Sequence, residues 1–491
     1  MIEITSMPII LIIILGTAGV FLPIISIIQK KTISSTLYWI ISLTALLFSI
    51  FYVVYRLISS DTLSTFSEDV LTIDLLGNLF AISMLLVAIL TTVGSLDFIR
   101  KKSHSSIYFS LILLSTIGMV LVAYSTDLIM LFVAWELMSI PTYVLAGFLK
   151  KNPSSNESAL KYFLFGALSS AIIIYGISIT YGLTGSTNIT EVIRIFSTID
   201  AEMLPLSLLA ISMFIAGFGF KMGLVPFHMW LPDTYEGAPP TITALLAAGT
   251  KKAGFAAAIR IIIIGTIALN FDWMVALGII AIMTMTIGNI AAILQKNITR
   301  MLAYSSIGHA GYILIGLSTY PLSNIGLQGS LFHIFNHAIM KCTAFIAITG
   351  VLIVIKTTYI EKIKGLGIKM PITALGFTIS LLALAGVPPL NGFWSKLMLF
   401  GAALDAGSTY SWMYWLAIAG VLNSALSLAY YGWIIRKMYF EGEKITTIKE
   451  PRSIIAVMIF SILFIVGIGV YPEPIIQFTD KIIFQLTMFL S

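Results

Sequence analysis

The chain has 491 residues, of which 58% are hydrophobic and only 10% are charged. Water-soluble globular proteins carry roughly a quarter charged residues, so this composition excludes that class and indicates a polytopic membrane protein. The net charge of +6 does not indicate a nucleic-acid partner, because basic residues set the orientation of a membrane protein. The single cysteine, Cys342, excludes a disulfide framework and a cysteine-bound iron–sulfur cluster.

Apolar runs of about 18–25 residues, each able to cross roughly 30 Å of hydrocarbon as a helix, recur from Pro8 to Val470. They predict an all-α polytopic membrane protein with residues 1–491 in a single transmembrane domain, because the polar connections are too short for a separate core. The expected helices, about fourteen, cover 8–28, 36–58, 75–98, 107–124, 127–149, 158–183, 204–228, 239–262, 273–294, 299–318, 327–355, 371–401, 412–436 and 453–471. The eleventh and twelfth are long enough to be bent or broken.

The two ends of the chain carry different signals. The first apolar run, Pro8 to Ile28, follows Met1-Ile2-Glu3 without a basic region or a small-residue cleavage site. We therefore expect a retained helix and not a signal peptide. The last stretch, Glu473 to Ser491, is expected to form a short amphipathic or interfacial tail.

Basic residues gather in alternate loops of this arrangement, and the loops between them are acidic or neutral. The positive-inside rule places basic loops in the cytoplasm, so both termini are expected on the extracytoplasmic side. The basic groups are Lys30-Lys31, Arg100-Lys101-Lys102, Lys150-Lys151, Lys296 with Arg300, Lys362 with Lys364 and Lys369, and Arg436-Lys437; acidic loop residues include Asp61, Glu68, Asp69, Asp74 and Asp405.

Intramembrane lysines flank a proline-rich break within Ala216–Gly254, AGFGFKMGLVPFHMWLPDTYEGAPPTITALLAAGTKKAG. Lys221 precedes the break, and Lys251 and Lys252 follow it. A lysine near the bilayer centre costs roughly 2.5–3.5 kcal/mol. Lysines placed there therefore indicate a function.

A second break is loosely similar to the first. GLVPFHMW at 223–230 is echoed by GVPPLNGFW at 386–394, and Lys396 follows the second break as Lys221 precedes the first. Paired interrupted helices in the two halves of a transporter-like chain indicate inverted repeats with polar paths at mid-depth.

Glu136 lies in the middle of the fifth apolar segment, in LFVAWELMSIPTYVLAGF. A buried carboxylate takes up a proton unless a nearby ammonium keeps it ionised. Lys221 is the expected partner. The alternative is that the pair only fixes helix packing, but ionisable groups inside a membrane more often mark a pathway.

Lys251 and Lys252 are neighbours, and neighbours on a helix point about 100° apart. We expect only one of them to face the interior, while the other could extend to an interface. Desolvation disfavours the charged form of a lysine, which suits a group that loads and releases a proton.

Further ionisable residues lie in the second half of the chain. Lys341 and His309 are mid-helix, and His333 and His337 share a helix face at i, i+4 spacing. Histidine titrates near physiological pH and suits a connecting site, although a satisfied interhelical hydrogen bond is the alternative for each ring. His228 and Asp233, near the first break, are expected to shape the loop or its cytoplasmic mouth.

Several chemistries lack their motifs. His333 and His337 enclose Ile-Phe-Asn and lack the glutamate of an H-E-x-x-H zinc site. The chain has no G-x-G-x-x-G after a strand, no G-x-x-x-x-G-K-[ST] and no G-x-S-x-G. We expect no cofactor and no metal in this chain. The remaining Glu, Lys and His residues have the composition of a proton path.

Long segments of the chain resemble one protein family. WELMSIPTYVLAGF at 135–148, FKMGLVPFHMWLPDTYEGAPP at 220–240, RMLAYSSIGHAGYILIGL at 300–317 and LAGVPPLNGFWSK at 384–396 closely resemble the antiporter-like subunit N of complex I, as does SALKYFLFGALSSAIIIYGISITYGLTGST at 158–187. This family includes subunits of bacterial NADH:quinone oxidoreductase and archaeal F420H2 dehydrogenase.

The resemblance implies a fold of fourteen helices with two inverted five-helix repeats, at about 107–262 and 273–436. The helices within 8–98 precede the repeats, and 453–471 and the short tail follow them. Helices seven and twelve would be discontinuous. The implied position is the membrane arm of a complex, in the bilayer, beside K-like and M-like subunits.

The resemblance also assigns site residues by position. Glu136 matches the family's fifth-helix glutamate, Lys221 its seventh-helix lysine, Lys251 its central eighth-helix lysine and Lys396 its twelfth-helix lysine. His309 falls on a polar site of the central axis. A lysine at position 396 and the short tail after Tyr471 favour the N type over its M-type and L-type sister subunits.

One position departs from the family pattern, which has an apolar residue where this chain has Lys252. Either Lys251 or Lys252 is therefore the central lysine. Lys341 and Lys252 stand as secondary candidates for proton transfer.

The function implied is proton translocation without redox chemistry in this chain. It would be a subunit of a proton-translocating NADH or F420H2:quinone or phenazine oxidoreductase, in the energy-transducing membrane of a prokaryote. Two alternatives are a subunit of a multisubunit sodium–proton antiporter and a structural subunit whose polar axis has lost its function.

Overall fold

The computed structural model describes residues 7–28, 34–59, 65–66, 70–100, 102–263, 273–320, 322–442 and 447–490. These residues form helices and one small antiparallel pair of strands, β1 (Thr65–Phe66) and β2 (Leu71–Thr72). Several of the charged loop residues named above lie outside the described residues: Lys30, Lys31, Asp61, Glu68, Asp69 and Lys101.

Every one of the expected transmembrane segments coincides with helix in the described part of the chain. Twelve helical segments there are long and apolar enough to cross a membrane, and Pro371–Ala385 is a shorter apolar helix. The helices are α1 (Met7–Ile28), α2 (Ser35–Ser59), α3 (Leu75–Ile99), α4 (Ser105–Tyr124), α5 (Leu128–Ala146), α6 (Pro153–Thr184), α8 (Leu204–Met222), α10 (Pro240–Leu245), α11 (Lys251–Ala258), α13 (Trp273–Ile293), α14 (Ile298–Thr319), α15 (Asn324–Ile355), α17 (Pro371–Ala385), α18 (Asn391–Gly407), α19 (Met413–Phe440), α20 (Arg452–Val470) and α21 (Glu473–Leu490).

Short helices occupy stretches that the apolar pattern left as connections. They are α7 (Ile189–Phe196), α9 (Trp230–Gly237), α16 (Leu366–Lys369) and the 3-10 turn η3 (Ile360–Ile363). A search for spans of about 20 apolar residues does not find them, because none has more than eight residues. The signal for α7 was its cap: the Asn188 side chain accepts a hydrogen bond from the Glu191 amide.

The seventh and twelfth predicted helices are interrupted, as the resemblance implied. The seventh ends as α8 at Met222, and Gly223 follows with φ of 67°. The twelfth divides into α17 and α18, and Gly386 between them has φ of 87°. Glycine adopts positive φ without a steric penalty, so it ends a helix readily. The eleventh helix, which was long enough to be broken, is the unbroken α15 of 32 residues and contains no proline.

The eighth predicted helix is irregular. It runs as α10, a π-helical turn η1 (Leu246–Thr250), α11 and a second π-helical turn η2 (Ile259–Ile263). The whole apolar window of Pro240–Ile261 is buried. π-Helical turns are rare and often lie at functional sites, and η1 ends directly before Lys251.

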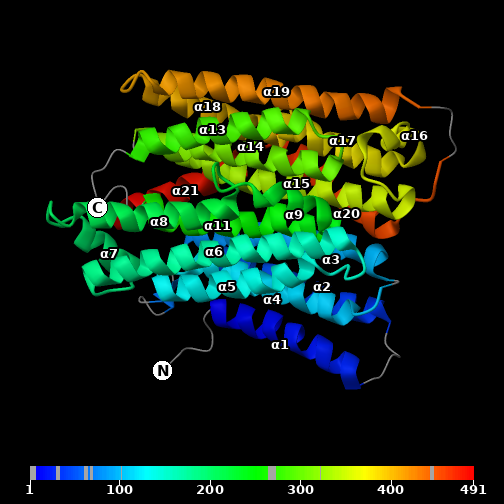
Figure 1. Ribbon diagram of the computed structural model, residues 1–491, viewed down its shortest axis with the longest axis horizontal. Coiled ribbons are helices and arrows are strands. Elements are labelled where there is room, and N and C mark those ends of the chain that lie inside the picture. The colour runs from blue at the N-terminus through cyan, green and yellow to red at the C-terminus, as the bar shows by residue number, and fades with distance from the viewer. Residues whose placement is uncertain are drawn as a thin grey trace. The chain divides into compact units, whose positions relative to one another are not determined.

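The chain divides into two compact units. Unit 1 contains residues 1–92, 99–222 and 249–272, and unit 2 contains 93–98, 223–248 and 273–491. In unit 1, α4 packs against α1 and α5, and α6 packs against α5 and α8, so that α4, α5 and α6 run side by side (Figure 1). In unit 2, α15 is central and packs against α14, α17, α18 and α20. The two inverted repeats stay a prediction.

The C-terminal stretch forms α21, which packs on α15 within unit 2. The Gln328 side chain on α15 donates to the Asp480 carboxylate at 2.5 Å. Ile482 and Ile483 are buried, whereas Phe484 is exposed. This helix therefore has one buried face and one exposed face, as expected for an amphipathic tail.

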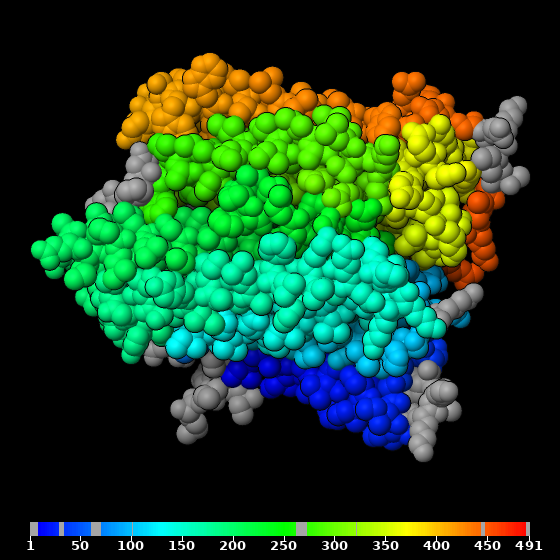
Figure 2. Space-filling model, viewed as in Figure 1, coloured from blue at the N-terminus to red at the C-terminus, as the bar shows by residue number. Residues whose placement is uncertain are grey.

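Helix α6 lies at the surface of unit 1 in the view of Figure 2. Its exposed side chains include Leu160, Phe163, Leu164, Phe165 and Leu168. A continuous exposed surface of this kind is unfavourable in water and favourable against lipid tails. Within the described residues, the lysines at positions 221, 251, 252, 341 and 396 are buried, which is the arrangement of a membrane protein with a polar interior.

A buried ion pair anchors the end of the Lys251 segment in unit 1. Arg260 in η2 donates to both Asp74 carboxylate oxygens at 2.8 Å and 3.0 Å and to the Ala123 carbonyl at 2.8 Å. The Arg260 and Asp74 side chains are only 7% and 13% exposed. Asp74 also accepts from the Gly77 amide at 2.7 Å and so caps α3.

Replacing Arg260 with alanine is expected to destabilise unit 1 by about 3–5 kcal/mol, because it leaves the Asp74 carboxylate buried without its partner. Thermal inactivation of the purified complex would measure this. Glu157→Ala is the control, since it removes the exposed Glu157–Lys161 pair at 2.6 Å and should cost about 0–1 kcal/mol. Equal shifts for the two variants would contradict the role of the buried pair.

Candidate functional site

Lys221 lies in the last turn of α8, and its ammonium is held by hydroxyls and aromatic rings of unit 1. Its side chain is buried, and Nζ donates to Ser139 Oγ at 3.0 Å and to Tyr162 OH at 2.8 Å. Nζ also lies 5.8, 5.5 and 4.9 Å from the ring centroids of Trp135, Tyr143 and Tyr162. Aromatic faces and the C-terminal end of a helix both attract a cation, so this site stabilises an ammonium.

Glu136 is half-buried on α5, and its carboxylate accepts a hydrogen bond from Ser170 Oγ of α6. No direct ion pair joins Glu136 and Lys221 among the described residues, and their electrostatic pairing stays a prediction. The lysine bonds Ser139, which lies three residues after Glu136 and therefore on the same side of α5.

Lys251 and Lys252 are both buried in unit 1, at 1% and 0% exposure. The expectation that only one of them faces the interior is therefore wrong. The physical reason is that α11 lies in a wholly buried segment and packs against α4 and α8. The Lys252 ammonium lies 5.9 Å from the Phe255 ring centroid.

The glycine after these lysines sets the distance between α11 and α8. A Cβ at Gly254 would lie 3.3 Å from the Lys221 Cβ, so the two helices are in close contact there. Lys251 precedes Gly254 by three residues and lies on the same helix face. Lys251, and not Lys252, therefore lies on the α8 side of α11, towards Lys221.

In unit 2, Lys341 is buried on α15 and reaches α14. Its Nζ donates to Ser305 Oγ at 2.6 Å and to the Leu302 carbonyl at 3.1 Å. Both acceptors are neutral. These two hydrogen bonds hold the ammonium through the dipoles of a hydroxyl and a carbonyl.

Three histidines gather beside it, on α14 and α15. His309 Nδ1 lies 3.0 Å from His333 Nε2, and His333 Nδ1 lies 2.9 Å from Ser395 Oγ of α18. The His337 ring centroid is 4.8 Å from that of His309. All three rings are buried. The connected nitrogens can hand a proton from one ring to the next, because each neutral imidazole has one donor and one acceptor.

Lys396 completes the unit 2 group, and the second helix break explains its position. Its Nζ donates to the Ala385 carbonyl at 3.0 Å and to Ser424 Oγ at 2.9 Å, and it lies 4.7 Å from the Tyr312 ring centroid. Ala385 is the last residue of α17, so its carbonyl has no partner within that helix. The break thus creates the acceptor that holds the lysine.

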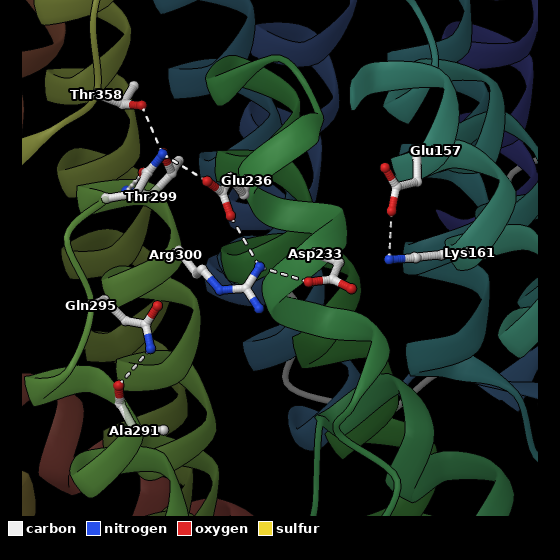
Figure 3. Close-up of polar contacts among 10 residues, drawn as sticks. Glu157, Lys161, Asp233, Glu236, Ala291, Gln295, Thr299, Arg300 and Thr358 are labelled. Carbon is white, nitrogen blue, oxygen red and sulfur yellow. Dashed lines mark hydrogen bonds and ion pairs between the residues drawn. The ribbon is translucent and has the colours of Figure 1, made fainter. Parts of the chain in front are cut away.

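A charged cluster stands at the end of α9 in unit 2 (Figure 3). Arg300 donates to Asp233 at 2.6 Å and to Glu236 at 3.0 Å, and Asn297 donates to Glu236 at 3.0 Å. The three charged side chains are 31–32% exposed. Asp233 therefore fixes the α9 turn against α14, consistent with its expected role in shaping the loop.

A second surface cluster surrounds Glu361 in η3, a connection between membrane helices. Lys437 and Lys364 approach its carboxylate at 2.6 Å and 3.1 Å. The hydrogen bond from Lys437, and next that from Lys364, lowers the pKa of the Glu361 carboxyl.

The sign of this shift gives a pH dependence. A carboxyl whose folded-state pKa lies below its unfolded value, near 4.3, stabilises the fold above that pH and loses the effect as the pH falls through the folded pKa. Wild type should exceed Glu361→Gln slightly in thermal inactivation temperature at neutral pH, and the difference should vanish below about pH 4. A difference that is unchanged in acid would contradict this assignment.

The fold and these buried groups define a class of protein. The chain belongs to the family of transmembrane subunits described as NADH:quinone oxidoreductase/Mrp antiporter, which matches residues 125–427. The buried lysines beside the two helix breaks, Lys221 and Lys396, therefore lie in a fold of the predicted family.

The particular relatives are N subunits. The chain is 40% identical over 437 residues to F(420)H(2) dehydrogenase subunit N of Methanosarcina mazei, covering 87% of each chain. It is 39% identical over 427 residues to NADH-quinone oxidoreductase subunit N of Trichlorobacter lovleyi, covering 86% of this chain and 85% of that one. A chain of respiratory complex I from Thermus thermophilus with bound aureothin superposes with a TM-score of 0.79 and 27% identity, covering 95% of this chain and 98% of that chain. The predicted family and antiporter-like fold are confirmed.

Sequence reasoning missed the neutral partners of the lysines. Ser139, Tyr162, Ser305 and Ser424 bind the ammonium groups directly. Hydroxyl residues inside apolar segments are common and often bond their own helix backbone, as Ser83 does at 2.7 Å to the Leu79 carbonyl. The local sequence therefore cannot distinguish a hydroxyl that binds a lysine from one that bonds its own helix backbone.

Proposed function

We propose that this chain is the proton-translocating, antiporter-like subunit N of a complex I-type respiratory dehydrogenase, and that it carries no redox chemistry itself. The observation that supports this most is the burial of Lys221, Lys251, Lys341 and Lys396, three of which donate to hydroxyl or carbonyl oxygens. Lysines in such settings can exist with or without their proton, which a relay requires and a structural ion pair does not.

The proposed mechanism moves charge from one lysine to the next. Electron transfer elsewhere in the complex would alter the field at the Glu136–Lys221 end, where Lys221 donates to Ser139. The charge on Lys251 and then on Lys396 would change in turn. Moving one charge across 100 mV requires roughly 2.3 kcal/mol. This is well below the several kcal/mol by which burial disfavours a charged group.

The proposal also covers the setting of the chain. It would lie in the energy-transducing membrane of a prokaryote, with both termini on the extracytoplasmic side and K-like and M-like subunits beside it. The relatives at 39–40% identity that are named above are N subunits of dehydrogenases, which supports membrane-arm partners. The absence of a cofactor from this chain stays a prediction.

The alternative, a sodium–proton antiporter subunit, shares the family and predicts a different ion requirement. The purified complex in liposomes should take up protons when its electron donor is added, at the same rate in sodium-free and sodium-containing buffer. Uptake that needs sodium, or sodium–proton exchange without electron transfer, would favour the alternative. Replacement of sodium by choline is the matched control for ionic strength.

A further inference from the structure

A line of hydrogen bonds in unit 2 passes through a residue that the lysine and histidine pattern does not include. Tyr431 lies on α19, is fully buried, and its hydroxyl shares a hydrogen bond with Ser305 Oγ. The same hydroxyl lies 3.5 Å from His309 Nε2. Ser305 in turn accepts the bond from Lys341. Tyr431 therefore joins the lysine side of unit 2 to its histidine side.

We propose that Tyr431 is a proton-carrying residue, and that its hydroxyl, with that of Ser305, forms the link between Lys341 and His309. The inference rests on the proposed function above. A hydroxyl both donates and accepts a hydrogen bond, so it can take a proton on its oxygen and release the one it held. From His309 the hydrogen-bond contacts continue through His333 to Ser395, the neighbour of Lys396.

The step balances without any other reactant. The Lys341 ammonium gives a proton to the Ser305 oxygen, the Ser305 hydroxyl proton moves to the Tyr431 oxygen, and the Tyr431 hydroxyl proton moves to His309 Nε2. Lys341 ends neutral, His309 ends protonated and both hydroxyls are restored. His309 must begin with its proton on Nδ1, the nitrogen that faces His333.

The ring and the hydroxyl of Tyr431 have separate roles. Its ring is fully buried and packs against that of Tyr430, with centroids 4.4 Å apart, so the ring itself contributes to packing. Phenylalanine would keep this packing and remove only the oxygen. Tyr431→Phe is therefore a variant that separates the proton link from the fold.

The test compares donor-driven proton uptake per electron by the assembled complex in liposomes. The protons carried by this chain are the difference between wild type and Lys251→Ala. Loss of a positioned proton-transfer group lowers the rate of proton transfer by about 100-fold. Tyr431→Phe should therefore lower the protons taken up per electron to the level of Lys251→Ala. Ser305→Ala breaks the same link from its other side and should have the same effect. Tyr124→Phe is the control, because it removes another buried hydroxyl, bonded to Asn78 at 2.7 Å, outside this line.

The outcomes separate this inference from the proposed function. Loss of uptake in Tyr431→Phe and Ser305→Ala, with uptake kept in Tyr124→Phe, supports the link. If Tyr431→Phe retains uptake while Lys251→Ala loses it, the link is wrong and the proposed function stands. If Lys251→Ala and the double variant Lys251→Ala/Lys252→Ala both retain full uptake, the proposed function itself fails. Equal losses in Tyr431→Phe and Tyr124→Phe would assign the effect to packing and overturn the proposal.

Discussion

Replacing Lys251 with alanine should abolish the proton uptake that passes through this chain and slow electron transfer in the complex. Lys251 lies on the face of α11 that meets α8, where a Cβ added at Gly254 would lie 3.3 Å from the Lys221 Cβ. Loss of a positioned proton-transfer group lowers such a rate by about 10²–10⁴-fold. Donor-driven uptake in liposomes, at equal assembly, would measure it.

Lys252→Ala is the matched comparison, because the two lysines are adjacent and equally buried. Its ammonium lies over Phe255, and we expect most of the uptake to remain. If Lys252→Ala abolished uptake while Lys251→Ala did not, Lys252 would be the central lysine. If both single variants kept uptake, the double variant would decide whether either lysine carries protons.

Replacing Lys396 with arginine should also stop proton transfer while keeping the positive charge. Arginine stays protonated in proteins, so it can satisfy the Ala385 carbonyl but cannot release a proton. Lys396→Met removes both the charge and the proton. We expect both variants to lose uptake by about 100-fold or more.

Lys396→Met and Lys396→Arg should differ in thermal stability, because the lysine bonds the backbone at the second helix break. Lys396→Met removes one of the two donors to the Ala385 carbonyl, the other being Ser424 Oγ at 3.1 Å, so its complex should inactivate at a slightly lower temperature than wild type, whereas Lys396→Arg should lose less. Uptake retained by Lys396→Arg would show that the charge alone matters and would contradict a proton-carrying role.

Much of the fold followed from the sequence because its cause is local. A run of about 20 apolar residues has to form a helix in hydrocarbon, and Gly223 and Gly386 marked the two breaks through their positive φ. The length of α15 was a weaker signal: without a proline, a helix of 32 residues has no cause to break.

The site was predicted only in part, because its contacts are distant in sequence. The intramembrane lysines were recognised from their cost in apolar segments, but their partners come from other helices. Lys221 bonds Ser139 and Tyr162, which precede it by 82 and 59 residues. The hydrogen-bond partner of Glu136 was not predicted either, because it is Ser170 on α6, 34 residues along the chain. The π-helical turn before Lys251 has no recognisable local signature.

The most direct test of the central claim is the number of protons taken up per electron by the assembled complex in liposomes when Lys221 is replaced with alanine. Lys221 joins the Glu136 region to the helix face that carries Lys251, so the account predicts a clear fall in protons per electron with the complex intact. An unchanged ratio would contradict the claim that this chain moves protons along its buried lysines.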